Sequence, residues 1–223
     1  MHTKHLIVIV TALLMLAPRA ASAQDEKRVH FNIGGGPTFP AGDVAERFST
    51  GWGPALGLTV DFNKQIGFQF EYAYRWFGLK DDLQAGTISA DHQTQQLDFN
   101  LVATLTKPGA PARAYIIAGP GTYYRNVEIT QYSGTGVICD PWLYVCGTFP
   151  VTSVLGSRGG WDFGFNVGGG VGIPISDSGA EFFIETRFHY VWGPEFTPPA
   201  GAASTTPITA NGQYWPLTFG LRF

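Results

Sequence analysis

Charged and polar side chains that could form ion pairs or act as acids and bases recur at every second position in several segments. Residues two apart in a β-strand lie on the same face, so each segment would gather its polar groups on one side of a sheet. If that side is shielded from solvent, opposite charges should pair there. The candidates for such a network are Glu71, Arg75, Asp98, Glu185, Arg187 and His189.

The only two cysteines, Cys139 and Cys146, lie within the stretch 131–160, which predicts the longest loop of the chain. In an exported protein they should form a disulfide. A zinc site is a weaker alternative, because two thiols without a further Cys or His leave a four-ligand set incomplete. The disulfide would hold the aromatic and apolar residues 142–144 in a small ring. This ring could anchor an extracellular ligand or enter the outer leaflet of a membrane.

The N-terminal segment predicts that the chain is exported. Lys4 precedes an apolar run from residue 6 to residue 17, and small residues follow as far as Ala23. The run is shorter than the roughly 20 residues that a membrane helix needs. It therefore predicts a secretory signal peptide over residues 1–23, with a single mature domain over residues 24–223. That domain has 12 basic and 17 acidic residues, a net charge of −5, which argues against nucleic-acid binding.

The composition favours β-structure. Hydrophobic residues make up 44% of the chain and charged residues only 14%, and the chain contains 29 Gly and 17 Phe. Such a mixture suits strands and turns better than helices. The mature domain contains no apolar run long enough for a membrane helix, so it could span a membrane only as a closed barrel. A soluble β-sandwich of the same length remains open on composition alone.

Alternation of apolar and polar residues predicts eight strands. In most of them the apolar face is assigned to the outside and the polar face to the interior. In the fifth segment Tyr115, Ile117 and Tyr123 are assigned to the outside, Glu128 is assigned to the interior, and a bulge is expected at Pro120 because proline lacks a ladder donor. The predicted strands cover residues 29–33, 55–62, 66–76, 96–105, 115–129, 161–173, 181–192 and 213–223.

The connections between these strands alternate in length. They are long after the first, third, fifth and seventh strands and short after the others. Membrane barrels of bacteria have even strand numbers, short periplasmic turns and longer extracellular loops. The fold class predicted is therefore all-β: an eight-stranded antiparallel up-and-down transmembrane β-barrel with both ends in the periplasm. The last strand should pair with the first to close it.

The signal peptide, the strand 29–36, the segment 115–121 and the final residues 219–223 resemble the eight-stranded outer-membrane β-barrel family of OmpA-like and OmpX-like proteins. The resemblance covers residues 24–223. It implies a monomer in the cell outer membrane that contacts outer-membrane lipid and lipopolysaccharide, without a cofactor or metal. It also implies an insertion signal recognised by the barrel-assembly machinery, carried by Phe219, Leu221 and Phe223.

The family resemblance leaves several functions to compare. We expect a structural or surface-interaction barrel with long extracellular loops and a polar, plugged lumen, because eight strands enclose only enough room for side chains. The alternative is a narrow porin-like channel in which Arg75 or Arg187 exchanges acidic partners. Some small barrels of the outer membrane are lipid A deacylases with His and Ser two residues apart. Here Val191 follows His189 at that spacing, so we expect no enzyme.

Overall fold

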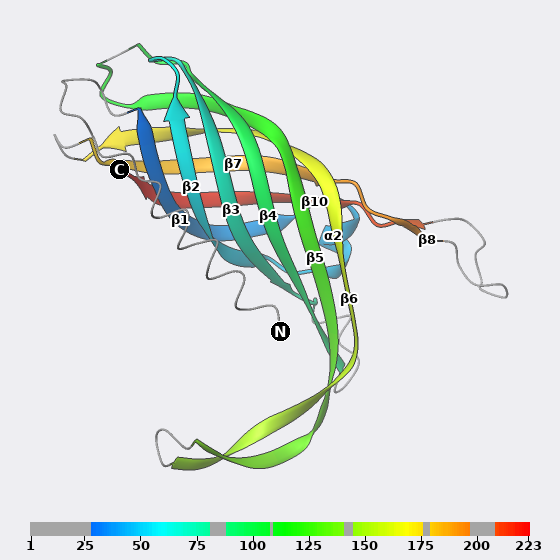
Figure 1. Ribbon diagram of the computed structural model, residues 1–223. Helices are drawn as coiled ribbons and strands as arrows, with labels where there is room; N and C mark the ends of the chain where they lie inside the picture. The colour runs from blue at the N-terminus through cyan, green and yellow to red at the C-terminus, as the bar shows by residue number, and fades with distance from the viewer. Residues whose placement is uncertain (1–27, 81–87, 108, 141–144, 176–178, 197–207) are drawn as a thin grey trace, which may run out of the picture.

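The computed structural model describes residues 28–80, 88–107, 109–140, 145–175, 179–196 and 208–223, and these residues form one closed antiparallel barrel (Figure 1). The predicted signal peptide lies outside them. The barrel contains eight strands in the order β1-β10-β7-β6-β5-β4-β3-β2, which confirms the predicted fold class. Their bounds are β1 Val29–Pro40, β2 Gly51–Asp61, β3 Ile66–Gly78, β4 Ile88–Thr104, β5 Arg113–Asp140, β6 Val145–Pro174, β7 Glu181–Val191 and β10 Gly212–Arg222.

The first and last strands close the barrel, as predicted. β1 and β10 pair from Asn32 opposite Arg222 to Pro40 opposite Tyr214. Every barrel strand therefore has a neighbour on both sides, which leaves no sheet edge along the wall. The beginning of β1, the end of β10 and the three short connections lie at one end, which we call the turn end; the opposite end is the loop end. No helix in the described residues is long and apolar enough to cross a bilayer.

The predicted inner and outer faces are confirmed in seven of the eight strands. On β10, for example, Trp215, Phe219 and Phe223 are exposed on the outside while Tyr214 and Arg222 are buried inside. The outer wall is apolar and aromatic, whereas the interior is mainly polar, which is the reverse of a soluble globular protein.

The face assignment of the fifth strand was wrong. Tyr115, Ile117 and Tyr123 are 2% exposed or less and point inward. Odd-numbered residues of this part of β5 therefore face the interior, and Glu128, an even-numbered residue, belongs to the outer face. The expected bulge at Pro120 is also absent, because β5 keeps a continuous register with β6 on both sides of Pro120. The register shifts fall later, between Ile129 and Thr130 and between Tyr132 and Gly134. The prediction assumed that apolar and aromatic residues face the lipid, and this assumption fails where a tyrosine or isoleucine packs among polar groups inside the lumen.

The predicted loop 131–160 is instead largely strand. β5 continues to Asp140 and β6 begins at Val145, and the two strands pair from Thr130 opposite Val154 to Asp140 opposite Val145. Figure 1 shows this two-stranded extension leaving the barrel at the loop end, where we call it the arm (residues 130–157). Only residues 141–144 of the stretch lie outside the described part.

Three smaller elements lie at the loop end. Helix α2, Asp43–Arg47, follows β1, and strands β8, Glu195–Phe196, and β9, Ile208–Thr209, form a separate antiparallel pair between β7 and β10. The strand β4 also begins eight residues before the predicted strand, because its polar first part continues to pair with β3 and β5.

Candidate functional site

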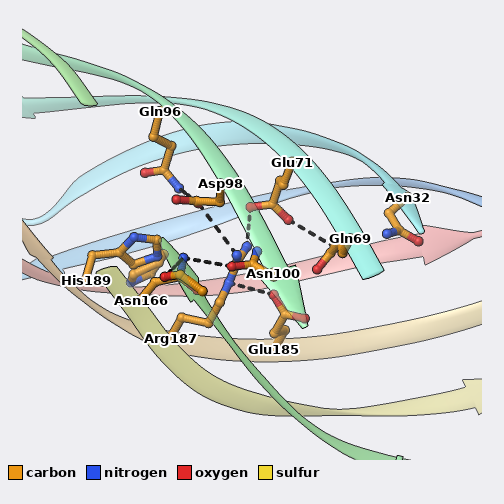
Figure 2. A network of polar contacts seen from close by, with 12 residues as sticks. Asn32, Gln69, Glu71, Gln96, Asp98, Asn100, Asn166, Glu185, Arg187 and His189 are labelled. Atoms are coloured by element: carbon orange, nitrogen blue, oxygen red, sulfur yellow. Dashed lines mark hydrogen bonds and ion pairs between the residues drawn. The ribbon is translucent and has the colours of Figure 1, made fainter. Parts of the chain in front are cut away.

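The centre of the barrel interior is organised around Arg187 on β7. Its guanidinium contacts three carboxylates: Nη2 donates to Glu71, Nε lies 2.8 Å from Glu185, and Nη1 lies 3.7 Å from Asp98. All four side chains are 5% exposed or less. Figure 2 shows that they approach one another from β3, β4 and β7 across the lumen. Arg187 therefore joins three strands that are not all neighbours in the sheet.

Neutral side chains orient the same carboxylates. Gln69 and Gln96 donate to Glu71 and Asp98 at 3.4 Å and 2.8 Å. Tyr115 donates its hydroxyl to Glu185 at 2.8 Å. Because a buried carboxylate is stable only when its charge and its lone pairs are satisfied, these donors belong to the same network as Arg187.

Glycines on the inner face of β6 make room for the bulky members of this network. A Cβ atom at Gly170 would lie 2.6 Å from the Tyr115 hydroxyl oxygen, and one at Gly164 would lie 2.8 Å from a ring carbon of Tyr123. No ordinary side chain fits at either distance. Gly170 thus leaves room for Tyr115, and Gly164 leaves room for Tyr123 and for the backbone oxygen of Tyr190, which would lie 2.3 Å from its Cβ atom.

Arg75 on β3 is buried in the same lumen but has no acidic partner within ion-pair distance among the described residues. Its side chain has no exposed surface, and Nη1 donates to the backbone oxygen of Gly53 at 2.8 Å. Its Nε and Nη2 atoms have no hydrogen-bond partner among the described residues. The prediction placed Arg75 in the charge network. The structure places it inside the barrel, but among the described residues the central carboxylates of Glu71, Asp98 and Glu185 pair with Arg187.

His189 lies between the network and the loop end. Its ring stacks on Tyr214, with centroids 4.8 Å apart, and its Nδ1 lies 3.1 Å from the hydroxyl oxygen of Tyr123. That hydroxyl also lies 3.1 Å from Asp98. His189 is thus connected to the charge network through Tyr123.

Buried aromatic and aliphatic side chains pack beyond His189 toward the loop end. Phe77, Tyr123, Val191 and Tyr214 form this cluster. Val191 shares the inner face of β7 with His189, and both side chains have no exposed surface. Val191 carries no hydroxyl group, so the His–Ser spacing of the lipid A deacylases is not present at this position.

A second group of ion pairs occupies the turn end. Arg113 donates to both carboxylate oxygens of Glu181, at 3.0 Å and 2.8 Å, and Arg222 lies 3.7 Å from the same carboxylate. His30 lies 3.1 Å from Asp61.

At the loop end, Arg125 pairs with Asp162 at 2.7 Å and donates to the backbone oxygen of Ala210 at 2.8 Å.

Arg113 and Arg125 are interior residues that were not predicted to be so. Both arginines are odd-numbered, like Gly119 and Gly121, so all four lie on the same face of β5. That shared parity was a usable signal, because a charge facing lipid is costly and a glycine on the inner face leaves space for a neighbour. The apolar character of Tyr115, Ile117 and Tyr123 outweighed it in the prediction.

The remaining predicted residues lie apart from the network. Phe219, Leu221 and Phe223 line the outer face of β10, and their role as an insertion signal stays a prediction. Cys139 lies directly opposite Cys146 in the register of the arm, but their side chains lie outside the described part of the structure. Among the described residues, no group of three or more His, Cys, Asp or Glu side chains could hold a metal ion.

Comparisons with known proteins agree with this architecture. The family model of the outer membrane protein β-barrel domain matches residues 9–223. A major outer membrane protein of Thermus thermophilus is 11% identical with a TM-score of 0.53, and the match covers 88% of this chain and 99% of that one. No curated protein matches the chain.

Two further solved structures are similar at lower scores. Neisserial surface protein A is 12% identical with a TM-score of 0.47, over 88% of this chain and 96% of that one. Ail, the attachment invasion locus protein of Yersinia pestis, is 13% identical with a TM-score of 0.42, over 87% of this chain and 96% of that one.

Proposed function

Because the chain belongs to the outer membrane protein β-barrel domain family, we propose that it is a surface-interaction barrel whose arm binds an extracellular polypeptide. Location in the bacterial outer membrane follows from the family and its structural neighbours. In such barrels the short turns face the periplasm, so the loop end and its arm face outward.

The free strand edges of the arm carry this proposal. β4 pairs with β5 no further than Gln131, and β7 pairs with β6 only from Gly164 onward. Beyond Gln131, each strand of the arm therefore has one neighbour among the described strands, and no other described strand pairs with the backbone N–H and C=O groups of its second edge. An extended polypeptide can add to such an edge as a further strand.

The composition of the arm supports the same proposal. Between residues 129 and 160 only Asp140 and Arg158 are charged. Exposed edge strands are usually protected by charges or prolines against unwanted pairing. An arm with few charges is therefore suited to pairing with another chain. The predicted Cys139–Cys146 disulfide would stabilise it, because directly opposite residues in an antiparallel pair have Cα atoms about 4.5 to 5.5 Å apart, within the range of disulfides.

Binding can be tested by replacing residues 129–156 with a two-residue Asn-Gly turn, which joins the directly opposite residues Glu128 and Ser157. Purified protein in lipid nanodiscs would be applied to immobilised extracellular-matrix and plasma polypeptides. We expect saturable binding by the intact protein and at least a tenfold loss on removal of the arm. A variant with residues 197–207 shortened serves as the control for loop deletion. Binding that survives removal of the arm, or an intact protein that binds none of these polypeptides, would contradict the proposal.

The interior supports a plugged lumen within the same proposal. Arg187, Glu71, Asp98 and Glu185 meet across the middle of the barrel, and an aromatic cluster covers them toward the loop end. We propose a non-enzymatic role, because the residue two positions after His189 is Val191 and both side chains are buried. We further propose a monomer that contacts lipid and lipopolysaccharide through its outer wall and is recognised by the barrel-assembly machinery through its last strand.

One observation favours the alternative of a narrow channel. The Nε and Nη2 atoms of Arg75 have no hydrogen-bond partner among the described residues, whereas Arg187 contacts three carboxylates. An exchange of Glu71 between the two arginines could therefore open a path. Single-channel recording in planar bilayers tests this idea, with Arg187→Ala as the variant. A channel gated by the ion pairs should conduct more after the substitution. Unchanged conductance would exclude this gate.

A further inference from the structure

The outer wall at the loop end differs between two sides of the barrel. On β7, β10, β1 and β2 its exposed residues are mainly aromatic, and they include Trp192, Trp215, Phe39 and Trp52, which are 44 to 53% exposed. On β4 and β5 the outward positions at this end are polar. We call them the polar strip, and its residues are Asp91, Gln93, Gln95, Asn126 and Glu128.

The strip forms one continuous surface across two neighbouring strands. Gln93 lies directly opposite Asn126, and Asp91 lies directly opposite Glu128. β4 and β5 run side by side in the wall (Figure 1). Directly opposite side chains in an antiparallel pair have Cβ atoms about 4.5 to 5.5 Å apart. One small polar ligand can therefore contact side chains of both strands.

Tyrosines of the next strand hold the two glutamines of the strip. On β3, Tyr74 donates its hydroxyl to the amide oxygen of Gln93 at 2.7 Å, and Tyr72 donates to that of Gln95 at 3.2 Å. Polar groups next to lipid are costly unless they form hydrogen bonds. Because a tyrosine binds the oxygen, each amide presents its N–H groups away from that ring. The wall thus keeps two oriented amides on its outer face.

Exposed aromatic rings border the strip on both sides. Trp76 on β3 is 42% exposed, and its ring lies 5.3 Å from that of Tyr74. Trp161 on β6 is 64% exposed, and its ring lies 5.3 Å from that of Tyr124 on β5. Aromatic rings beside amides and carboxylates suit a saccharide. The C–H groups of a sugar ring pack on aromatic faces, and its hydroxyls form hydrogen bonds with amides and carboxylates.

The two carboxylates of the strip favour hydroxyl groups over phosphate. Asp91 and Glu128 carry like charges at directly opposite positions, which destabilises a sheet. A ligand that donates hydroxyl groups to both carboxylates would offset this repulsion through charge-assisted hydrogen bonds. A phosphate would add a further negative charge and be repelled. The ligand expected here is therefore the sugar part of a molecule.

We propose that the polar strip binds the saccharide part of the lipopolysaccharide that borders this wall in the outer leaflet. The strip continues the lipid-facing wall, since Phe99 and Leu101 lie further along the same face of β4 and are 42% and 55% exposed. Its neighbour at this level is therefore a lipid headgroup. This inference rests on the outward orientation of the loop end and deepens the proposed contact with lipopolysaccharide.

Binding can be measured by surface plasmon resonance, with the full chain in uncharged detergent passed over immobilised rough lipopolysaccharide. The test variant combines Gln93→Leu and Gln95→Leu, which removes both oriented amides. Gln213→Leu is the matched control, because Gln213 also faces outward at the loop end but lies on β10, away from the strip. The change of gel mobility on heating verifies that each variant is folded.

We expect the double glutamine variant to bind lipopolysaccharide about tenfold more weakly or worse, which corresponds to about 1.4 kcal/mol. The control Gln213→Leu should bind like the unaltered protein. Equal binding by the double variant and the unaltered protein would overturn the proposal, as would an equal loss in the control.

Removal of the phosphates distinguishes the sugar from the charged groups of the same lipid. Lipopolysaccharide that has been dephosphorylated with hydrofluoric acid should bind at least as tightly as the untreated lipid. A variant with Asp91→Asn and Glu128→Gln should bind both lipids about threefold more weakly or worse, because it loses the charge-assisted hydrogen bonds. Loss of binding on dephosphorylation, or tighter binding by this variant, would identify phosphate as the ligand and overturn the proposal.

The arm provides a separate readout. The protein without the arm keeps Glu128 and should bind lipopolysaccharide like the intact protein. The double glutamine variant should in turn keep the polypeptide binding expected of the arm. Failure of the strip and failure of the arm are therefore distinguishable. Lipopolysaccharide binding that disappears with the arm would assign the saccharide to the arm and contradict the role of the strip.

Discussion

The same two strands, β5 and β6, behave differently inside the barrel and in the arm. Inside the barrel each has a partner on both edges, and its side chains separate a polar interior from an apolar outer wall. In the arm each has one partner among the described strands. Figure 1 shows both situations along one continuous pair of strands.

The difference shows which constraints produce which sequence pattern. In the barrel, an inner residue must fit a crowded, polar interior, so adding or removing a single atom can change the stability of the barrel. In the arm, both faces of the two-stranded sheet lie outside the barrel, so no strict alternation is required. We therefore expect substitutions in the interior to change barrel stability strongly, and substitutions in the arm to leave it unchanged.

The largest effect is expected for Arg187→Met. Removing the guanidinium leaves the carboxylates of Glu71, Asp98 and Glu185 buried without their shared cation. Loss of one partner from a buried ion pair costs about 3 to 5 kcal/mol. Urea unfolding of the folded barrel in lipid vesicles, followed by tryptophan fluorescence, would measure this loss. A cost below about 1 kcal/mol would show that the network does not hold the interior together.

Gly170→Ala should have a smaller but clear effect. The new methyl group would lie within 2.7 Å of the Tyr115 ring, its hydroxyl and the backbone oxygen of Ile184. Overpacking of this kind costs about 1 to 3 kcal/mol. Gly160→Ala on the same strand is the control, because nothing lies within 4 Å of its new methyl group. Equal unfolding free energies for the two variants would contradict the steric role of Gly170.

Arg75→Met should change barrel stability by less than about 1 kcal/mol. The substitution loses the hydrogen bond to Gly53, which is worth about 1.5 to 3 kcal/mol for a charged donor. It also removes a buried charge that has no carboxylate within ion-pair distance among the described residues, and this gain offsets most of the loss. Comparing the two variants separates the effect of burial on the unfolding free energy from the effect of ion pairing, because both arginines are buried and, of the two, Arg187 is the one with ion pairs among the described residues. A loss as large as that of Arg187→Met, in the same urea experiment, would show that burial alone sets the cost.

Most of the barrel could be predicted from the sequence because lipid outside and polar groups inside impose an alternation of period two. This alternation predicted the inner and outer faces of seven strands and the closure of β1 on β10. It also predicted the inward positions of Glu71, Asp98, Glu185 and Arg187. The face of β5 could not be obtained in this way. Tyr115 and Tyr123 are amphipathic, with a hydroxyl that reaches a carboxylate, so an interior of this kind accepts them.

The arm and the arrangement of the ion pairs could not be predicted. Residues 130–157 are rich in Gly, Ser and Thr and lack regular alternation, so their sequence is typical of a loop. Their pairing continues β5 and β6 out of the barrel through two register shifts, which no local pattern predicts. The preference of the three acids for Arg187 over Arg75 depends on how strands distant in sequence meet across the lumen, which no local spacing records.

Replacing Cys139 and Cys146 with serine should have the smallest effect on the barrel. The cysteines lie opposite each other at the far end of the arm, so the barrel transition in urea should stay within about 0.5 kcal/mol of the unaltered protein, as for substitutions far from the core. The arm itself should lose about 2 to 3 kcal/mol, the value that the loop-entropy model gives for a ring of this size. Limited proteolysis should therefore cut the arm faster in the serine variant while the barrel stays intact. The unaltered protein should have no thiol that reacts with maleimide before reduction. Two reactive thiols, or identical cleavage of the two proteins, would show that the disulfide does not form, and the arm would then be stabilised by its strand pairing alone.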